Sequence, residues 1–203
     1  MSRIAGDRIY LDRDGLLGPP PRYIIWFHGC NRNCPGCIAI DWNRKKLPAF
    51  DLSTRTVAKT IQQSENIEGV TISGGEPFLQ PDALYELVTE LHRSKLGIIV
   101  YSGYELSELK RMQSGKINST LEMIDVLIDG RYRERLDDDL PYRGSSNQTI
   151  HQFTGRYKEF FTSQNKRNSS IEKKDGQELL TGIPNKITKK RWQETKEHNG
   201  YKL

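Results

Sequence analysis

All three cysteines of this 203-residue chain lie on one short loop, at Cys30, Cys34 and Cys37. The loop, Gly29–Cys37, is rich in Gly, Pro and Asn and directly follows an apolar run of strand length, Tyr23–Phe27. Three soft thiolates so close in sequence predict a metal centre. An iron–sulfur cube normally takes four cysteines, so a three-cysteine loop leaves one iron open to bind a small molecule. The fold must therefore present this loop at the end of a strand.

A structural zinc ion is the alternative for this loop. His28 lies two residues before Cys30, so three cysteines and one histidine could form a closed zinc site. Zinc sites more often combine two pairs of cysteines from separate segments, whereas here all the sulfur lies on one loop. The sequence favours a cluster over zinc. An odd number of clustered cysteines does not form a disulfide framework, and thiolates that bind metal need a reducing compartment, which indicates the cytoplasm.

Apolar runs of strand length alternate with helical patterns through the first three quarters of the chain. Each predicted strand is apolar on both faces, which indicates a parallel sheet covered by helices and hence an α/β fold. Further strands are predicted over 69–73, 96–101 and 124–130, helices over 54–64, 81–94 and 105–111, and a short hairpin over 3–11 around Gly6-Asp7. Ser53 and Pro81 stand where a helix N-cap and a first helical turn favour them.

The loops that follow the predicted strands carry the chemistry. In parallel sheets such loops meet beyond the carboxyl ends of the strands. The cysteine loop, Gly74–Pro77, Ser102–Tyr104 and Asp129-Gly130 are therefore expected to converge. In Gly74–Pro77 (sequence GGEP), two glycines allow close approach of the backbone to a ligand, and Glu76 can accept hydrogen bonds from an ammonium group. Such a tetrapeptide alone is more often a tight strand–helix turn; its place after the cysteine loop favours a ligand.

The positive charge of the chain is concentrated near its end. The net charge is +5, and residues 154–203 hold 12 of the 31 Lys and Arg but only 6 of the 26 Asp and Glu. A hairpin turning at Asp175-Gly176 and a basic helix over Lys186–Lys196 are predicted there. We therefore expect a core domain over 1–153 and a small basic extension over 154–203. Interleaved Lys and Glu are more typical of a solvated surface than of a nucleic-acid site, so nucleic acid is not an expected partner.

No membrane segment or secretion signal is expected from the sequence. The apolar runs fall short of the about 18 residues of a membrane span. The residues after Met1 lead into no signal-peptide core. These features predict a soluble, cytoplasmic protein.

The cysteine spacing C-x3-C-x2-C after the first apolar strand, followed by GGEP after the next, resembles the radical S-adenosylmethionine superfamily. The resemblance implies a partial (β/α) barrel with a small C-terminal addition. It further implies one [4Fe–4S] cluster on Cys30, Cys34 and Cys37, with the methionyl amine and carboxylate of S-adenosylmethionine on the fourth iron. In that superfamily the reduced cluster cleaves the cofactor to methionine and a 5′-deoxyadenosyl radical, which abstracts a hydrogen atom from the substrate. No general base is then required.

Four further segments are similar to the activating proteins of anaerobic ribonucleotide reductase, over about residues 7–152. They are Pro35-Gly36 within the cysteine loop, Asp41-Trp42, Asp129–Tyr132 and Tyr142–Gln148. Those proteins bind the large reductase subunit and abstract hydrogen from one of its glycines, which leaves a stored glycyl radical. The resemblance therefore implies a glycyl radical enzyme as partner, and an electron donor such as flavodoxin or ferredoxin.

The resemblance also assigns roles to single positions. The methionyl end of the cofactor would lie along Gly74, Gly75 and Glu76, and the ribose or carboxylate near Ser102. The adenine would pass Gly36 and Ile38; many members carry an aromatic residue where Gly36 stands, so Trp42 becomes the candidate for stacking. The implied partner or cofactor contacts are Asp129, Arg143, Ser145 and Asn147. A satisfied strand-end aspartate and a simple polar turn remain alternatives for these last positions.

Two other functions stay open on the sequence. One is a stand-alone radical S-adenosylmethionine enzyme that acts on a small molecule, nucleotide or peptide. The other is a non-catalytic metal-binding interaction protein. Because all three cysteines are used in one loop, the chain has no thiols of its own left for a second cluster, which argues against the peptide-modifying members that carry extra clusters.

Overall fold

The structure is a computed structural model, and it describes residues 3–39, 50–162, 166–174 and 177–198. Within these residues, seven strands form one sheet in the order β3-β1-β2-β4-β5-β6-β7. Neighbouring strands from β2 to β6 run parallel, while β1, β3 and β7 pair antiparallel at the two edges. The strands are β1 Arg3–Asp12, β2 Arg22–Phe27, β3 Phe50–Asp51, β4 Gly69–Gly74, β5 Gly97–Tyr101, β6 Val126–Asp129 and β7 Thr149–Gln152. The predicted α/β class with a mostly parallel central sheet is confirmed.

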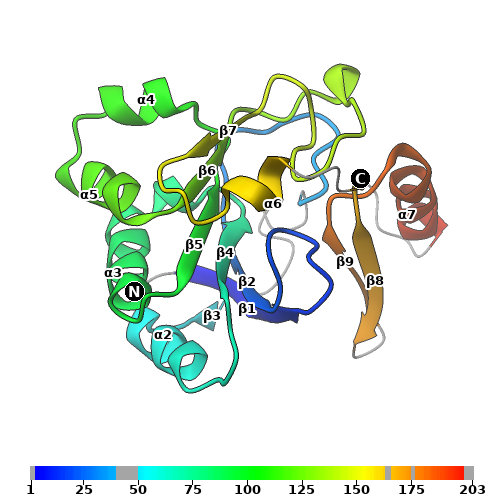
Figure 1. The fold of residues 1–203 in the computed structure, drawn as a ribbon. Helices are drawn as coiled ribbons and strands as arrows, with labels where there is room; N and C mark the ends of the chain where they lie inside the picture. Colours follow the sequence, from blue (N-terminus) through cyan, green and yellow to red (C-terminus); the bar gives the residue numbers. More distant parts are fainter. Residues whose placement is uncertain (1–2, 40–49, 163–165, 175–176, 199–203) are drawn as a thin grey trace.

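Helices cover one face of this sheet. They are α2 (Thr54–Gln62), α3 (Pro81–Arg93) and α5 (Gly115–Met123), with the short α4 (Leu106–Arg111) beside them. The apolar residues of α3 recur every three or four positions and form one buried stripe. This stripe packs on strand side chains such as Val70, Ile72 and Ile98. Figure 1 shows α2, α3 and α5 gathered on the same side of the sheet.

The opposite face is covered mainly by irregular segments. Side chains alternate along β2, so Ile25 and Phe27 point to the helices while Ile24 and Trp26 point to this second face. There they pack against Leu16 and Leu17 of the loop between β1 and β2. Further along the sheet, aromatic side chains from the end of the core fill the same face: Tyr142 and Tyr157, with Phe160 and Phe161 of α6 (Lys158–Thr162).

The end of the chain forms the predicted hairpin and helix. Strands β8 (Ser169–Lys174) and β9 (Gln177–Gly182) pair antiparallel, and α7 covers Lys186–His198. The turn residues between β8 and β9 lie outside the described residues. Figure 1 shows this hairpin and α7 on the side of the sheet away from α2 and α3. None of the helices in the described part of the chain combines the length and apolarity needed to cross a membrane.

Some local features differ from what the sequence predicts. The hairpin expected over 3–11 is wrong, because β1 is one strand that pairs with β2 on both sides of Gly6-Asp7. The register shifts between Ile4 and Ile9, so the extra residues are absorbed as an irregularity and not as a turn. Helix α5 and edge strand β7 were not predicted. Ser53 does precede α2, but its side chain makes no capping hydrogen bond.

Candidate functional site

One cavity lies beyond the carboxyl ends of the parallel strands. It is lined by the cysteine loop, by Gly74–Glu76 after β4, by Ser102-Gly103 after β5 and by Gly130 after β6. These are the strand-end loops that the sequence expects to converge. The structure brings them together because strands β2, β4, β5 and β6 lie side by side in parallel.

The three cysteines all line this cavity, are half-buried and form no disulfide with one another. Burial raises the pKa of the Cys30 thiol, with smaller upward contributions from the negative charges of Glu76 and Cys34. A hydrogen bond from the Arg32 N–H to the Cys30 sulfur, at 3.3 Å, acts in the opposite direction. Among the described residues, no three His, Cys, Asp or Glu side chains converge on the position of a single ion. Three thiols around one cavity suit a cluster whose iron corners each take one cysteine.

The cysteine loop is fastened to the turn before α4. The Asn31 side-chain amide donates to the Tyr104 hydroxyl at 2.7 Å. The Arg32 guanidinium lies 4.3 Å from the centre of the Tyr104 ring, where a cation is attracted to the ring face, and it pairs with Glu108 of α4 at 3.1 Å. Sequence reasoning missed Arg32 and Glu108. Tyr104 closes the loop Ser102–Tyr104 that strand order had already singled out, so its position carried a signal.

Two glycines let the end of β4 touch the start of the cysteine loop. The Gly75 N–H donates to the Phe27 carbonyl at 2.6 Å, and the Glu76 N–H donates to the Gly29 carbonyl at 2.8 Å. A Cβ atom on Gly75 would lie 2.0 Å from the Gly29 oxygen, and Gly74 has a φ of +104°. Both positions exclude a side chain, so the Gly-Gly pair is what allows the two loops to join.

Glu76 is fully buried beneath the cavity and ties three loops together. One carboxylate oxygen accepts from the Ser102 hydroxyl at 3.0 Å and the Phe78 N–H at 3.1 Å, and the other accepts from the Gly103 N–H at 2.7 Å. Burial raises its pKa to about 7, although these hydrogen bonds act to lower it. The Ser102 hydroxyl also accepts from the Tyr104 N–H at 3.0 Å. In the structure, Glu76 and Ser102 therefore connect the loops after β4 and β5 through hydrogen bonds.

Of the remaining predicted cofactor residues, two line the cavity and one lies outside the part of the chain that the structure describes. Gly36 and Ile38 line the cavity. Gly36 has a φ of +70°, and the space that its side chain would take is filled by the Glu134 carboxylate, 2.8 Å from the Cβ position. Trp42 lies outside the described residues.

The four predicted partner residues face inward to their own loops. The Asp129 carboxylate accepts from the Leu106 N–H at the start of α4 and pairs with His151 at 2.9 Å. The Ser145 hydroxyl accepts from the Arg133 N–H and donates to Asn147. Arg143 pairs with Asp138. Neighbours of these residues line the cavity in their place, namely Gly130, Tyr132, Gly144 and Gln148.

Gln148 fixes the shape of that neighbouring loop. Its side-chain oxygen accepts from the Gly144 and Ser145 N–H groups, and its amide donates to the Gly130 carbonyl. The Gln148 amide thus clamps the backbone of the loop over 144–148. Tyr132 packs across Gly144, where a Cβ atom would come within 2.8 Å of its ring.

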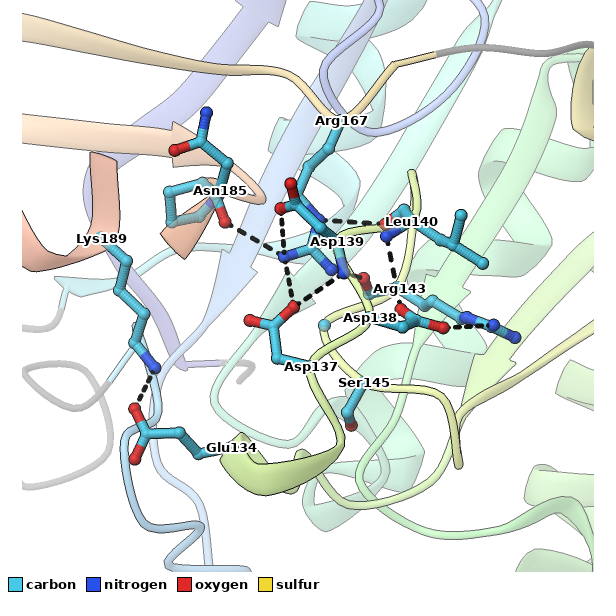
Figure 2. A network of polar contacts seen from close by, with 12 residues as sticks. Glu134, Asp137, Asp138, Asp139, Leu140, Arg143, Ser145, Arg167, Asn185 and Lys189 are labelled. Atoms are coloured by element: carbon cyan, nitrogen blue, oxygen red, sulfur yellow. Dashed lines mark hydrogen bonds and ion pairs between the residues drawn. The ribbon is translucent and has the colours of Figure 1, made fainter. Parts of the chain in front are cut away.

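A second wall of the cavity comes from the C-terminal segment, residues 166–198. Arg167, Leu180, Gly182–Pro184 and Lys189 all line it. The Arg167 side chain is almost fully buried. It donates to Asp137 at 2.8 Å and to the carbonyls of Leu140, Arg143 and Pro184, so it binds the segment to the core (Figure 2). Sequence reasoning missed this wall, since no motif marks Arg167 or Lys189 among the other basic residues of the extension.

Known proteins match the first three quarters of the chain. A family model described as "4Fe-4S single cluster domain" matches residues 16–151. The chain is similar to the anaerobic ribonucleoside-triphosphate reductase-activating protein of Salmonella typhi, at 33% identity over 151 residues, which are 70% of this chain and 95% of that protein. Proteins of the same name from Haemophilus influenzae (32% identity, 71% and 96% covered) and Escherichia coli K12 (30% identity, 70% and 95% covered) match the same share.

Proposed function

Because the chain belongs to the family of 4Fe-4S single cluster proteins that includes the anaerobic ribonucleoside-triphosphate reductase-activating proteins, we propose that it activates an anaerobic ribonucleotide reductase as a radical S-adenosylmethionine enzyme. One observation carries the proposal: the three thiols and the Gly74–Glu76 loop line one cavity, and backbone hydrogen bonds join that loop to the start of the cysteine loop. When bound there, a reduced [4Fe–4S] cluster supplies the electron that cleaves S-adenosylmethionine to methionine and a 5′-deoxyadenosyl radical, which takes a hydrogen atom from a glycine of the reductase.

The cysteine loop would hold the cluster. Cys30, Cys34 and Cys37 provide three thiolate ligands and leave one iron for the cofactor. Asn31 and Arg32 on the same loop are fixed to Tyr104, so the ligands are held before the cluster arrives. Residues held in place in this way lose little freedom on binding, which favours the bound state.

The loop after β4 would take the methionyl end of the cofactor. The backbone of Gly74 and Gly75 faces the cavity without side chains, so a ligand can approach it closely. The hydrogen bonds of Glu76 with Ser102 and Gly103 keep this backbone in place. Gly36 and Ile38 line the part of the cavity that we assign to the adenine, and Trp42 stays a predicted stacking residue.

The loop over 130–148 would meet the partner's glycine. Tyr132, Gly144 and Gln148 line the cavity there. Arg143, Ser145 and Asn147 would act indirectly, because their side chains bond within the loop and keep its shape. Asp129 would likewise act through α4. A flavodoxin or ferredoxin remains our proposed electron donor.

The sheet agrees with a partial barrel of the radical S-adenosylmethionine type. The parallel strands follow the order β2-β4-β5-β6, and the helices between them pack on one face. A doubly wound sheet would carry helices on both faces. We keep the division into a core over 1–153 and an extension over 154–203 as a proposal.

The test is anaerobic reconstitution with iron and sulfide, followed by dithionite and S-adenosylmethionine. We expect a brown cluster and 5′-deoxyadenosine, and a glycyl doublet in electron paramagnetic resonance when the large subunit of the reductase is added. A reductase whose radical-forming glycine is replaced by alanine serves as the control and must give no doublet. Absence of 5′-deoxyadenosine overturns the enzyme function. Formation of 5′-deoxyadenosine without a doublet overturns the reductase as partner and favours a stand-alone enzyme.

A further inference from the structure

Lys189 is a basic side chain of α7 that turns inward. It lines the cavity, and its side chain is 11% exposed, whereas Lys190, the next residue, is 79% exposed. The Lys189 ammonium donates to the Tyr132 hydroxyl at 2.8 Å and to the Glu134 carboxylate at 2.7 Å. Burial lowers the pKa of Lys189, but the bonds to Glu134 and Tyr132 more than offset this and raise it overall. Lys189 is therefore a fixed positive charge.

Glu134 lies between Lys189 and the cysteine loop. Its carboxylate fills the space beside Gly36, so close that both oxygens lie 2.8 Å from the position of a Cβ atom. Gly36 stands between Cys34 and Cys37. A negative charge fixed at this point opposes the addition of an electron to a cluster on these cysteines, and a lysine bound to the carboxylate removes most of that opposition.

Lys189 is held in place by the anchoring of the C-terminal segment. The Arg167 side chain is 2% exposed, and its ion pair with the Asp137 side chain, 6% exposed, is shielded from water. The same guanidinium donates to the Pro184 carbonyl, just before α7. The Asn185 side chain then accepts from the Thr188 N–H in the first turn of α7. Figure 2 shows Arg167 bonded to Asp137 and to the backbone just before Asn185, with the Lys189–Glu134 pair beside them.

We propose that Lys189 is a positioning residue that sets the reduction potential of the cluster. It acts through its ion pair with Glu134, whose carboxylate lies against Gly36. The inference rests on the proposed function, because it presupposes the cluster. It goes beyond that function by giving the C-terminal segment a part in electron uptake. The family model ends at residue 151, so this control comes from outside the region that defines the family.

The experiment is a potentiometric titration of the reconstituted protein, followed by the paramagnetic signal of the reduced cluster. Lys189→Met keeps an apolar stem but removes the charge, and we expect the midpoint potential to become more negative. At the potential where half of the native clusters are reduced, fewer than half should be reduced in the variant. Lys190→Met is the matched control: it removes the same charge from the outer side of the same helix and should shift the potential much less. Lys189→Arg should stay near the native value.

A second substitution tests whether Glu134 is the intermediary. Glu134→Gln in the Lys189→Met background should move the potential back toward the native value. Glu134→Gln alone should make it less negative, because it leaves Lys189 unpaired; this variant keeps the lysine and serves if Lys189→Met does not fold. Equal shifts in Lys189→Met and Lys190→Met, or no shift in Glu134→Gln, overturn the proposal. Such results leave the proposed function intact, whereas a native protein without cluster or 5′-deoxyadenosine overturns that function itself.

Discussion

The wall built by the strand-end loops and the wall built by the C-terminal segment face the same cavity but are held by different chemistry. The first is joined by backbone hydrogen bonds between loops that each follow their own strand, such as Gly75 to Phe27 and Glu76 to Gly29. The second is held by side-chain ion pairs between residues far apart in sequence: Arg167 and Asp137 are 30 positions apart, and Lys189 and Glu134 are 55 apart. The first wall carries the groups that we expect to bind the cluster and the cofactor, whereas the second attaches the C-terminal segment to the core. Substitutions in the first wall should therefore affect cluster binding, and substitutions in the second should affect stability.

The largest effect is expected in the first wall, on loss of one thiol. Cys34→Ala should abolish the cluster and the formation of 5′-deoxyadenosine. Stability without the cluster should change by no more than about 0.5 kcal/mol, because Cys34 is only half-buried. Iron and acid-labile sulfide per chain, together with denaturant unfolding of the cluster-free protein, measure both quantities. Full cluster content in Cys34→Ala would remove this residue from the ligand set.

In the second wall, by contrast, we expect a substitution to lower the stability of the protein. Arg167→Met leaves Asp137 buried without its partner, and breaking a buried pair costs about 3–5 kcal/mol. Arg55→Met is the matched control: Arg55 pairs with Glu86 on the surface, where its side chain is 78% exposed, and such pairs contribute about 0–1 kcal/mol. Denaturant unfolding of both variants measures the difference. Similar costs would show that the Arg167 pair is not the anchor of the segment.

The same contrast explains what the sequence could predict. The four parallel strands, helices α2, α3 and α4 and the meeting of four loops follow from apolar periodicity and from the parallel order of β2, β4, β5 and β6. These signals are local, and the rule that strand-end loops converge turns them into a site. Lys189 carries no comparable signal, because it stands in a run with Lys190 and Arg191, and only the folded helix decides which of them turns inward.

Two details of the first wall were equally out of reach. The Glu134 carboxylate beside Gly36 depends on a contact between segments about a hundred residues apart, which no local pattern encodes. The predicted partner residues Arg143, Ser145 and Asn147 turn inward, since a short polar loop satisfies its own backbone before it offers groups to a ligand. A motif marked the loop correctly but did not tell which of its side chains face the cavity.

Glu76 provides a test that depends on pH. Its pKa in the folded protein is about 7, above the ordinary 4.5, so between these values the folded state keeps a proton that the unfolded chain has lost. Stability should therefore fall as pH rises from about 4.5 to 7, by up to about 3 kcal/mol. Glu76→Gln cannot ionise and should lack this slope, so the native advantage over it should shrink toward neutral pH. Thermal unfolding of both cluster-free proteins from pH 5 to 8 measures it; a constant difference would contradict the assignment.

Gly75 tests how closely the two loops must approach. Gly75→Ala places a Cβ atom 2.0 Å from the Gly29 oxygen, so the cysteine loop must shift, at a cost of about 1–3 kcal/mol and with loss of cofactor cleavage. Gly115→Ala is the matched control at the start of α5, where no described atom lies within 4 Å of the added Cβ. Alanine there should be neutral or stabilising by up to about 1 kcal/mol. Native 5′-deoxyadenosine yield from Gly75→Ala would show that the contact is dispensable.

The smallest effect separates anchoring of the cysteine loop from stability of the sheet. Tyr104→Phe removes the hydroxyl that accepts from Asn31 at 2.7 Å but keeps the ring beneath Arg32. Tyr23→Phe is the matched control, since its hydroxyl is bonded to that of Ser64 at 2.9 Å, away from the cavity. Each variant should lose about 1 kcal/mol of stability, the usual contribution of one hydrogen bond.

Only Tyr104→Phe should also take up less cluster during reconstitution, because only its hydroxyl restrains the loop that bears the thiols. Cluster uptake is measured as the iron content after a fixed, limiting reconstitution time. It is then compared with the free energy of unfolding of each variant. If both variants lose cluster in proportion to their stability, Tyr104 supports the fold and not the loop. The cysteine loop would then be held by its other contacts, such as the Arg32–Glu108 ion pair.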